Sequence, residues 1–111
     1  EPALIKVAPG DTVKFVATDK SHNAETIKGM VPDGGTTFAG KMNEDVAVKF
    51  DQAGIYGVKC APHYAMGMVA MVVVGTSANE EQAKAIPQVG KAKQVFATLF
   101  ERLAANKTAA K

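Results

Sequence analysis

Hydrophobic and polar residues alternate in several short stretches of the first three-quarters of the chain. The alternation is clearest at residues 13–18, 46–50 and 55–60, and it places the apolar side chains of each stretch on one face of an extended strand. Residues 4–7 form a further short apolar stretch, and residues 68–74 are apolar throughout, as in a strand that is buried on both faces. Several short strands separated by turn residues predict a β-sandwich or barrel.

From residue 79 onward the hydrophobic period changes to that of a helix. Asn79 and Gln82 have the spacing of a capping box, which predicts the start of a short helix that Pro87 ends. After Gly90, apolar residues recur with helical spacing, at Val95, Phe96, Leu99, Phe100 and Leu103. We therefore expect two C-terminal helices whose apolar faces pack on the sandwich.

Length and composition fit a single domain over residues 1–111, with the β-sandwich in residues 1–75 and the helices in residues 79–105. A chain of 111 residues, of which 47% are hydrophobic, suits one compact core. The apolar stretches are too short to span a membrane, so we expect a soluble protein. The net charge of +2 and the few aromatic residues argue against nucleic-acid binding.

The one cysteine of the chain lies at the end of a predicted strand. Tyr56, Val58 and Cys60 share one face of this strand, and Gly57 and Lys59 share the other. The cysteine sulfur should therefore point into the core. A single cysteine excludes an internal disulfide and is usually only a small buried hydrophobic residue, but its neighbours favour a different interpretation.

Soft and nitrogen donors gather around this cysteine. His63 follows Cys60 by three residues, a thioether follows at Met66 or Met68, and His22 lies in the loop after an earlier strand. Two imidazoles, one thiolate and a weak axial thioether form the ligand set of blue copper sites. The pattern predicts one copper ion, and it does not decide which methionine is axial.

Four segments resemble the cupredoxin family and, within it, the pseudoazurin subfamily. They are VAPGDTVKF at 7–15, DKSHN at 19–23, AGIYGVKC at 53–60 and APHYAMGM at 61–68. The resemblance implies a mainly β fold, a cupredoxin-like Greek-key β-sandwich with two C-terminal helices. Pseudoazurins begin with a further strand, whereas this chain starts where the second strand should. We therefore expect that the first strand is missing from this chain or that a sheet edge is exposed.

The resemblance also implies the ligands and the role of the copper. The ligands would be His22, Cys60, His63 and Met68, with Met66 as a neighbour that does not bind the metal. The protein would be a monomeric one-electron carrier of the bacterial periplasm, cycling between Cu(II) and Cu(I). Its redox partners would be a denitrification enzyme such as copper nitrite reductase, or another periplasmic reductase, and an upstream cytochrome.

Two residues beside the predicted ligands are expected to adjust the site. Asn23 follows one ligand and is well placed to brace it, since bonds behind the ligands fix their orientation. Pro62 lies two residues after Cys60 and cannot donate a backbone N–H to the sulfur. We expect that this keeps the thiolate electron-rich and the reduction potential low.

A docking surface is expected around the edge of His63. Small or apolar residues, among them Ala65 and Met66, would form an apolar patch through which the electron passes. Lysines would surround this patch and steer a partner toward it, namely Lys20, Lys41 and Lys59.

Three other functions compete with electron transfer. An enzyme would need an open coordination position or a second metal site, and the predicted ligands use both histidines of the chain. A structural zinc site seldom includes a thioether. A copper chaperone or store would use exposed thiols or methionines, whereas Cys60 is expected in the core. The sequence therefore favours a carrier that is not an enzyme.

Overall fold

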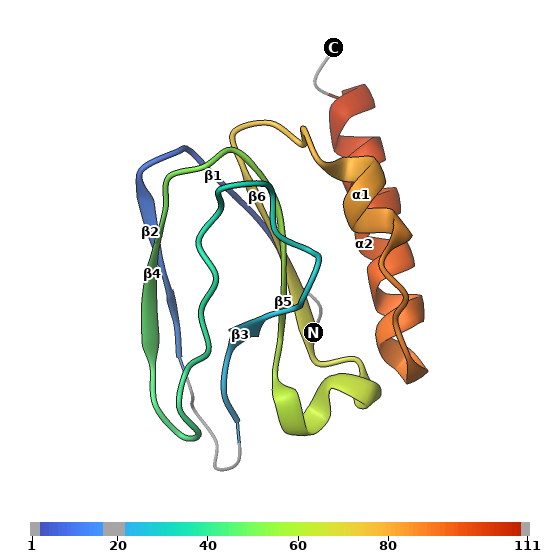
Figure 1. The fold of residues 1–111 in the computed structure, drawn as a ribbon. Coiled ribbons are helices and arrows are strands. Elements are labelled where there is room, and N and C mark those ends of the chain that lie inside the picture. The colour runs from blue at the N-terminus through green and yellow to red at the C-terminus, as the bar shows by residue number, and fades with distance from the viewer. Residues whose placement is uncertain (1–2, 17–21, 110–111) are drawn as a thin grey trace.

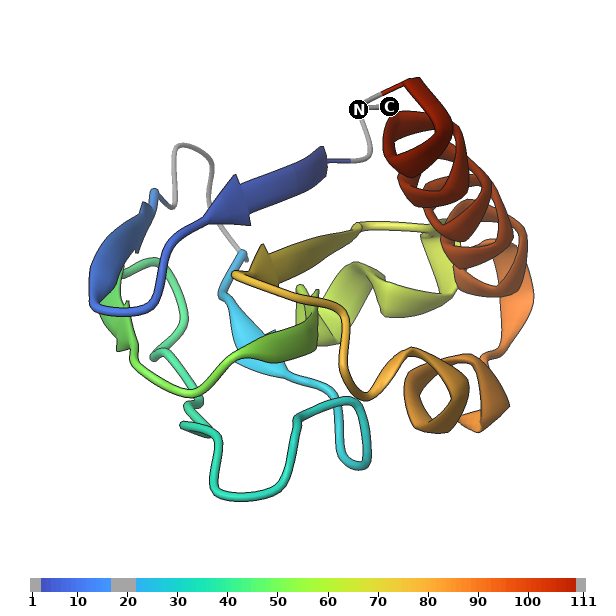
Figure 2. The same cartoon turned by 90° about the horizontal axis from the view of Figure 1, so that it is seen from above.

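The computed structural model describes residues 3–16 and 22–109, which form three layers (Figure 1). A two-stranded sheet faces a four-stranded sheet, and two helices lie on the other side of the four-stranded sheet (Figures 1 and 2). This arrangement confirms the prediction of a mainly β protein with C-terminal helices.

The four-stranded sheet carries the strands that lead to the site. Its order is β1 (Ala3–Val7), β6 (Val69–Val74), β5 (Gly54–Lys59) and β3 (Glu25–Thr26). β1 and β6 are parallel, and the other neighbours are antiparallel. The second sheet pairs β2 (Asp11–Phe15) with β4 (Val46–Phe50) in antiparallel orientation.

β6 separates two hydrophobic clusters, which explains its uninterrupted apolar sequence. Val72 and Val74 face the two-stranded sheet and pack with Phe50 and other buried residues. Met71 and Val73 face the helices, in the cluster that contains Phe96, Leu99 and Leu103. Complete burial of such side chains stabilises the fold by about 1.5–3 kcal/mol each. The prediction of a strand buried on both faces is confirmed.

The two predicted helices are present, as α1 (Glu80–Ala85) and α2 (Gly90–Ala109). α1 ends before Pro87, as predicted. The described residues contain no helix with the combination of length and apolar character that crossing a bilayer requires.

The predicted capping box at the start of α1 is wrong. The Asn79 side chain makes no capping bond and instead accepts the Ile55 N–H at 2.6 Å and donates to the Ile55 carbonyl at 3.0 Å. The Gln82 amide donates to the Gly29 carbonyl at 3.2 Å. Both side chains thus bind backbone groups outside the helix, because tertiary contacts compete successfully with local capping.

Candidate metal centre

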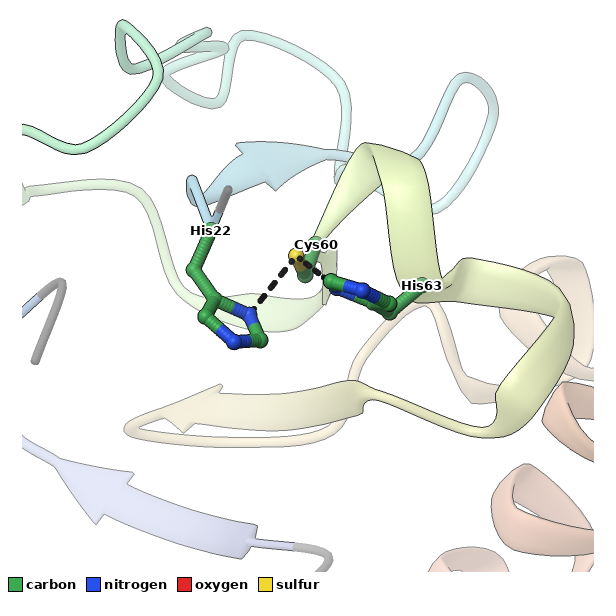
Figure 3. A group of neighbouring side chains, drawn as sticks. All are labelled: His22, Cys60 and His63. Carbon is green, nitrogen blue, oxygen red and sulfur yellow. Dashed lines mark hydrogen bonds between the residues drawn. The ribbon is translucent and has the colours of Figure 1, made fainter. Parts of the chain in front are cut away.

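Two loops at one end of the sandwich bring three donor side chains together (Figure 3). The Cys60 Sγ lies 3.4 Å from His22 Nδ1 and 3.5 Å from His63 Nδ1. One potential donor atom of each residue lies within 4.8 Å of those of the other two. Among the described residues, no other group of three histidine, cysteine or acidic side chains meets this condition.

Local backbone geometry places Cys60 and His63 side by side. Cys60 follows β5 in an extended conformation and is only 3% exposed, which agrees with the predicted inward sulfur. It is followed by the 3₁₀ helix η1 (Ala61–Met66), in which Pro62 occupies the first turn. Proline is favoured there because its missing N–H has no partner to lose. The His63 N–H donates to the Cys60 carbonyl at 3.0 Å, so one turn separates the two side chains.

The loop returns to β6 through a left-handed glycine. Gly67 has a φ of 90° and donates its N–H to the Tyr64 carbonyl at 3.0 Å. A positive φ of this kind favours glycine because other residues are strained there. The Met68 carbonyl then accepts the Cys60 N–H at 3.0 Å. This bond holds the Met68 backbone beside the cysteine.

Both methionines border the cluster, but in different ways. Met66 and Met68 line an open hollow together with His22 and His63. Met68 also lines a second hollow together with Cys60, and Met66 does not. The Met66 side chain is the more exposed of the two, at 70% against 44% for Met68.

Asn23 links the two loops that carry the cluster. Its Oδ1 accepts the Ala61 N–H at 2.8 Å, which ties the residue after His22 to the residue after Cys60. Its Nδ2 donates to Glu25 Oε1 at 3.0 Å. Its Nδ2 also donates to the Gly40 carbonyl at 3.2 Å, so Asn23 braces the loop of His22 against three neighbouring segments.

The residues that were expected to form a docking surface around His63 differ in their exposure to solvent. Ala65 and Met66 are exposed, and His63 is half-buried. Lys41 is exposed, whereas the Lys59 side chain is 28% exposed. Lys20 falls outside the described residues.

Sequence analysis did not identify the partners of Lys59. Its ammonium lies 3.8 Å from Glu25 Oε2 and 5.1 Å from the centre of the Tyr64 ring. Glu25 and Lys59 are direct cross-strand neighbours on β3 and β5. No sequence pattern could have shown this pairing, since β3 has only two residues.

Comparison with known proteins identifies a family of copper-binding proteins. The model of copper binding proteins of the plastocyanin/azurin family matches residues 1–75. Pseudoazurin of Methylorubrum extorquens is 55% identical over 87 residues, which are 78% of this chain and 59% of that protein. Pseudoazurin of Paracoccus pantotrophus is 45% identical over 95 residues, 85% of this chain and 66% of that protein. This chain thus spans 59% of the length of the first relative.

A solved structure extends the agreement to the fold. The structure of a pseudoazurin from Sinorhizobium meliloti superimposes with a TM-score of 0.89 at 44% identity, covering 91% of this chain and 80% of that one. The resemblance to the cupredoxins is confirmed, including the C-terminal helices that the sequence predicts. The chain therefore belongs to the copper-binding plastocyanin/azurin family and, within it, to the pseudoazurins.

Proposed function

We propose that this chain carries single electrons on one copper ion, bound by His22, Cys60, His63 and Met68, which cycles between Cu(II) and Cu(I). One observation carries the proposal: a buried thiolate donor and two imidazoles from separate loops converge in a copper-binding family. This donor set supports both oxidation states, since imidazole suits Cu(II) and the sulfur ligands favour Cu(I).

The spacing of the three donors fits a metal between them. A metal about 2.0–2.3 Å from each donor, at roughly trigonal angles, would hold neighbouring donors about 3.5–3.7 Å apart. The distances from the Cys60 sulfur to the two imidazole nitrogens are 3.4 and 3.5 Å. Both separations are within a few tenths of an ångström of this spacing, and the three donor atoms lie within 4.8 Å of one another.

Met68 is a better axial ligand than Met66. Its carbonyl is bonded to the Cys60 N–H, so its backbone is fixed next to the thiolate ligand. It also lines hollows on the Cys60 side and on the histidine side, and its side chain is less exposed. A weak bond from its thioether would complete a site of the blue-copper type.

The four ligands favour electron transfer over catalysis. A catalytic metal keeps a coordination position open for water or substrate. Two imidazoles, a thiolate and an axial thioether would leave no such position here. Zinc fits less well than copper because structural zinc sites are built from cysteine, histidine and carboxylate ligands.

The proposed setting is the periplasm of a bacterium, with a copper nitrite reductase or another reductase as the electron acceptor and a cytochrome as the donor. The named relatives are bacterial pseudoazurins. Exposed small and apolar residues lie within three positions of the half-buried His63 in the same loop, namely Ala61, Pro62, Ala65 and Met66. Such a patch suits the small interface of a transient redox complex.

A redox titration of the copper-loaded chain tests this function. We expect reversible uptake of one electron per chain. Replacement of the proposed axial ligand, Met68→Leu, should change the reduction potential because the axial ligand tunes it. Met66→Leu is the matched control and should leave the potential close to that of the original chain. Irreversible reduction, or equal effects of the two variants, would contradict the proposed ligand set.

A further inference from the structure

The connection between α1 and α2 contacts the loop that carries His63. The Tyr64 hydroxyl donates to Gln88 Oε1 and accepts the Val89 N–H at 3.4 Å. Tyr64 follows His63 directly and belongs to η1. A segment more than twenty residues further along the chain therefore holds the residue next to a proposed copper ligand.

The other end of the Gln88 side chain reaches the core. Its Nε2 donates to Met30 Sδ at 3.0 Å, and Met30 is completely buried. The Met30 carbonyl accepts the Gly57 N–H at 2.8 Å. Gly57 lies in β5, the strand that leads to Cys60. Gln88 thus links Met30, which is bonded to β5, with Tyr64, the residue after His63.

Met30 packs closely over Gly57. A Cβ atom added at Gly57 would lie 2.6 Å from Met30 Sδ. Such a contact is far inside van der Waals distance, so the Met30 side chain occupies the space that a side chain at residue 57 would need. The sulfur that accepts the Gln88 bond therefore packs directly against β5.

The start of α2 packs on the same loop. Gly90 has a φ of 56°, and a Cβ atom added there would lie 2.5 Å from the Ala65 carbonyl oxygen. A Cβ atom added at Gly67 would lie 3.0 Å from the Val95 side chain. The backbone of η1 and the first turns of α2 therefore approach as closely as glycine allows.

We propose that Gln88 is a positioning residue, which fixes His63 relative to Cys60 by holding Tyr64 against the Met30–β5 core. The inference rests on the proposed function, because it gives the C-terminal helical region a role in shaping the copper site. Groups behind metal ligands fix ligand orientation and raise metal affinity. A held His63 also moves less when the copper changes oxidation state, which suits fast electron transfer.

The first test uses the metal-free chain, so it does not depend on copper. Gln88→Leu removes the three hydrogen bonds of the amide, to Tyr64, Met30 and Ile86, with little change in size. Hydrogen exchange at the His63 and Gly67 amides should then become about fivefold faster, the effect of losing one typical hydrogen bond. These amides are bonded to the Cys60 and Tyr64 carbonyls and therefore report on η1.

Gln82→Ala provides the matched control. Gln82 lies in α1 and donates to the Gly29 carbonyl at 3.2 Å, away from η1. This variant loses a glutamine side-chain hydrogen bond that does not involve η1, so exchange in η1 should stay as in the original chain. Equal exchange in Gln88→Leu and the original chain, or equal acceleration by both variants, would overturn the proposal.

The second test measures copper release to a chelator. Gln88→Leu and Tyr64→Phe should each release copper about tenfold faster, the lower end of the effect of removing groups behind metal ligands. The double variant should accelerate release by less than the product of the two single effects, because both changes break the Tyr64–Gln88 bond. Release at the original rate in both single variants would refute the positioning role. A chain that binds no copper would instead refute the proposed function, and the exchange test would still decide the role of Gln88.

Discussion

At the candidate metal centre, the buried Cys60 sulfur is followed by a loop in which a proline removes one backbone N–H donor. Cys60 donates its N–H to the Met68 carbonyl, and its own carbonyl accepts the His63 N–H. Pro62, two residues after the cysteine, has no N–H to offer the sulfur. A copper-bound thiolate at this position would therefore receive no hydrogen bond from the backbone of residue 62.

Replacement of this proline should raise the reduction potential. Pro62→Ala introduces an N–H near the sulfur, and a hydrogen bond there stabilises the more electron-rich Cu(I) form. A contribution of about 1 kcal/mol corresponds to a rise of about 40 mV for a one-electron couple. Cyclic voltammetry measures this change. Pro9→Ala, in the turn between β1 and β2, is the control and should have no effect. An unchanged or lower potential in Pro62→Ala would show that the proline only stiffens the loop.

At the level of the elements, side chains from the helical region support the strands that lead to the site. Asn79, just before α1, binds both backbone groups of Ile55 in β5. Gln88, between α1 and α2, contacts Met30 and Tyr64. The segments next to the helices thus form specific hydrogen bonds with the sandwich, in addition to the packing of the helices' apolar faces.

Loss of the Asn79 side chain should destabilise the whole domain. Asn79→Ala leaves the Ile55 N–H and carbonyl at the sheet without their partners, and Ile55 is completely buried. We expect the free energy of unfolding to fall by about 1–3 kcal/mol. Urea denaturation of the metal-free chain measures this loss, with Asn79→Asp as the comparison because it keeps the acceptor oxygen. A loss below that of Asn79→Asp would contradict the assigned contacts.

At the scale of the whole molecule, the buried phenol of Tyr56 makes a contribution to stability that depends on pH in alkali. Tyr56 is completely buried between the sheets, and its hydroxyl donates to the Gln52 carbonyl at 2.8 Å. Burial, which disfavours the charged form, raises the pKa of Tyr56 above its usual value of about 10. The unfolded chain therefore loses this proton at lower pH than the folded chain.

The stability contributed by this pKa difference is complete below about pH 10 and decreases as the pH rises toward the folded pKa. Tyr56→Phe removes the titrating group and should show a smaller decrease in the free energy of unfolding above pH 10. Denaturant titrations of both chains between about pH 8 and pH 11, a range that includes the usual tyrosine pKa, measure the difference. Parallel curves would show that Tyr56 does not ionise on unfolding.

The electrostatic attraction of a redox partner is also a property of the whole molecule, because it depends on the charges exposed at the surface. Lys41 is exposed in a turn whose Asn43 N–H donates to the His22 carbonyl at 2.8 Å, which places this lysine near the centre. Lys59 is less exposed and lies near Glu25, which offsets its charge. We expect the association rate with a reductase to fall as salt is added. Lys41→Ala should weaken this salt dependence more than Lys59→Ala does, and the reverse order in stopped-flow measurements would contradict the assignment.

Sequence reasoning recovered the parts of this structure that periodicity and local spacing determine. The parity of β5 predicted the buried Cys60, and the apolar run of β6 predicted a strand with two buried faces. It failed at Asn79, whose side chain binds β5 instead of capping α1. It also missed Gln88, because a glutamine in a connection carries no signal for a partner far away in the sequence.

The choice between Met66 and Met68 shows the same limit within the candidate site. Both thioethers lie in one short loop, and spacing alone does not separate them. The bond between the Met68 carbonyl and the Cys60 N–H depends on how β5 and β6 pair beyond their last strand residues. That information belongs to the fold, and a sequence supplies it only through resemblance to a family.

The central claim is a thiolate bound to copper within this cluster. Its most direct test is the visible absorption spectrum of the chain loaded with Cu(II), recorded beside the Cys60→Ser variant. The account predicts an intense charge-transfer band from the Cys60 sulfur to Cu(II), which disappears on reduction and is absent from the variant. A copper-loaded chain that is colourless when oxidised, or a band that survives in Cys60→Ser, would contradict it.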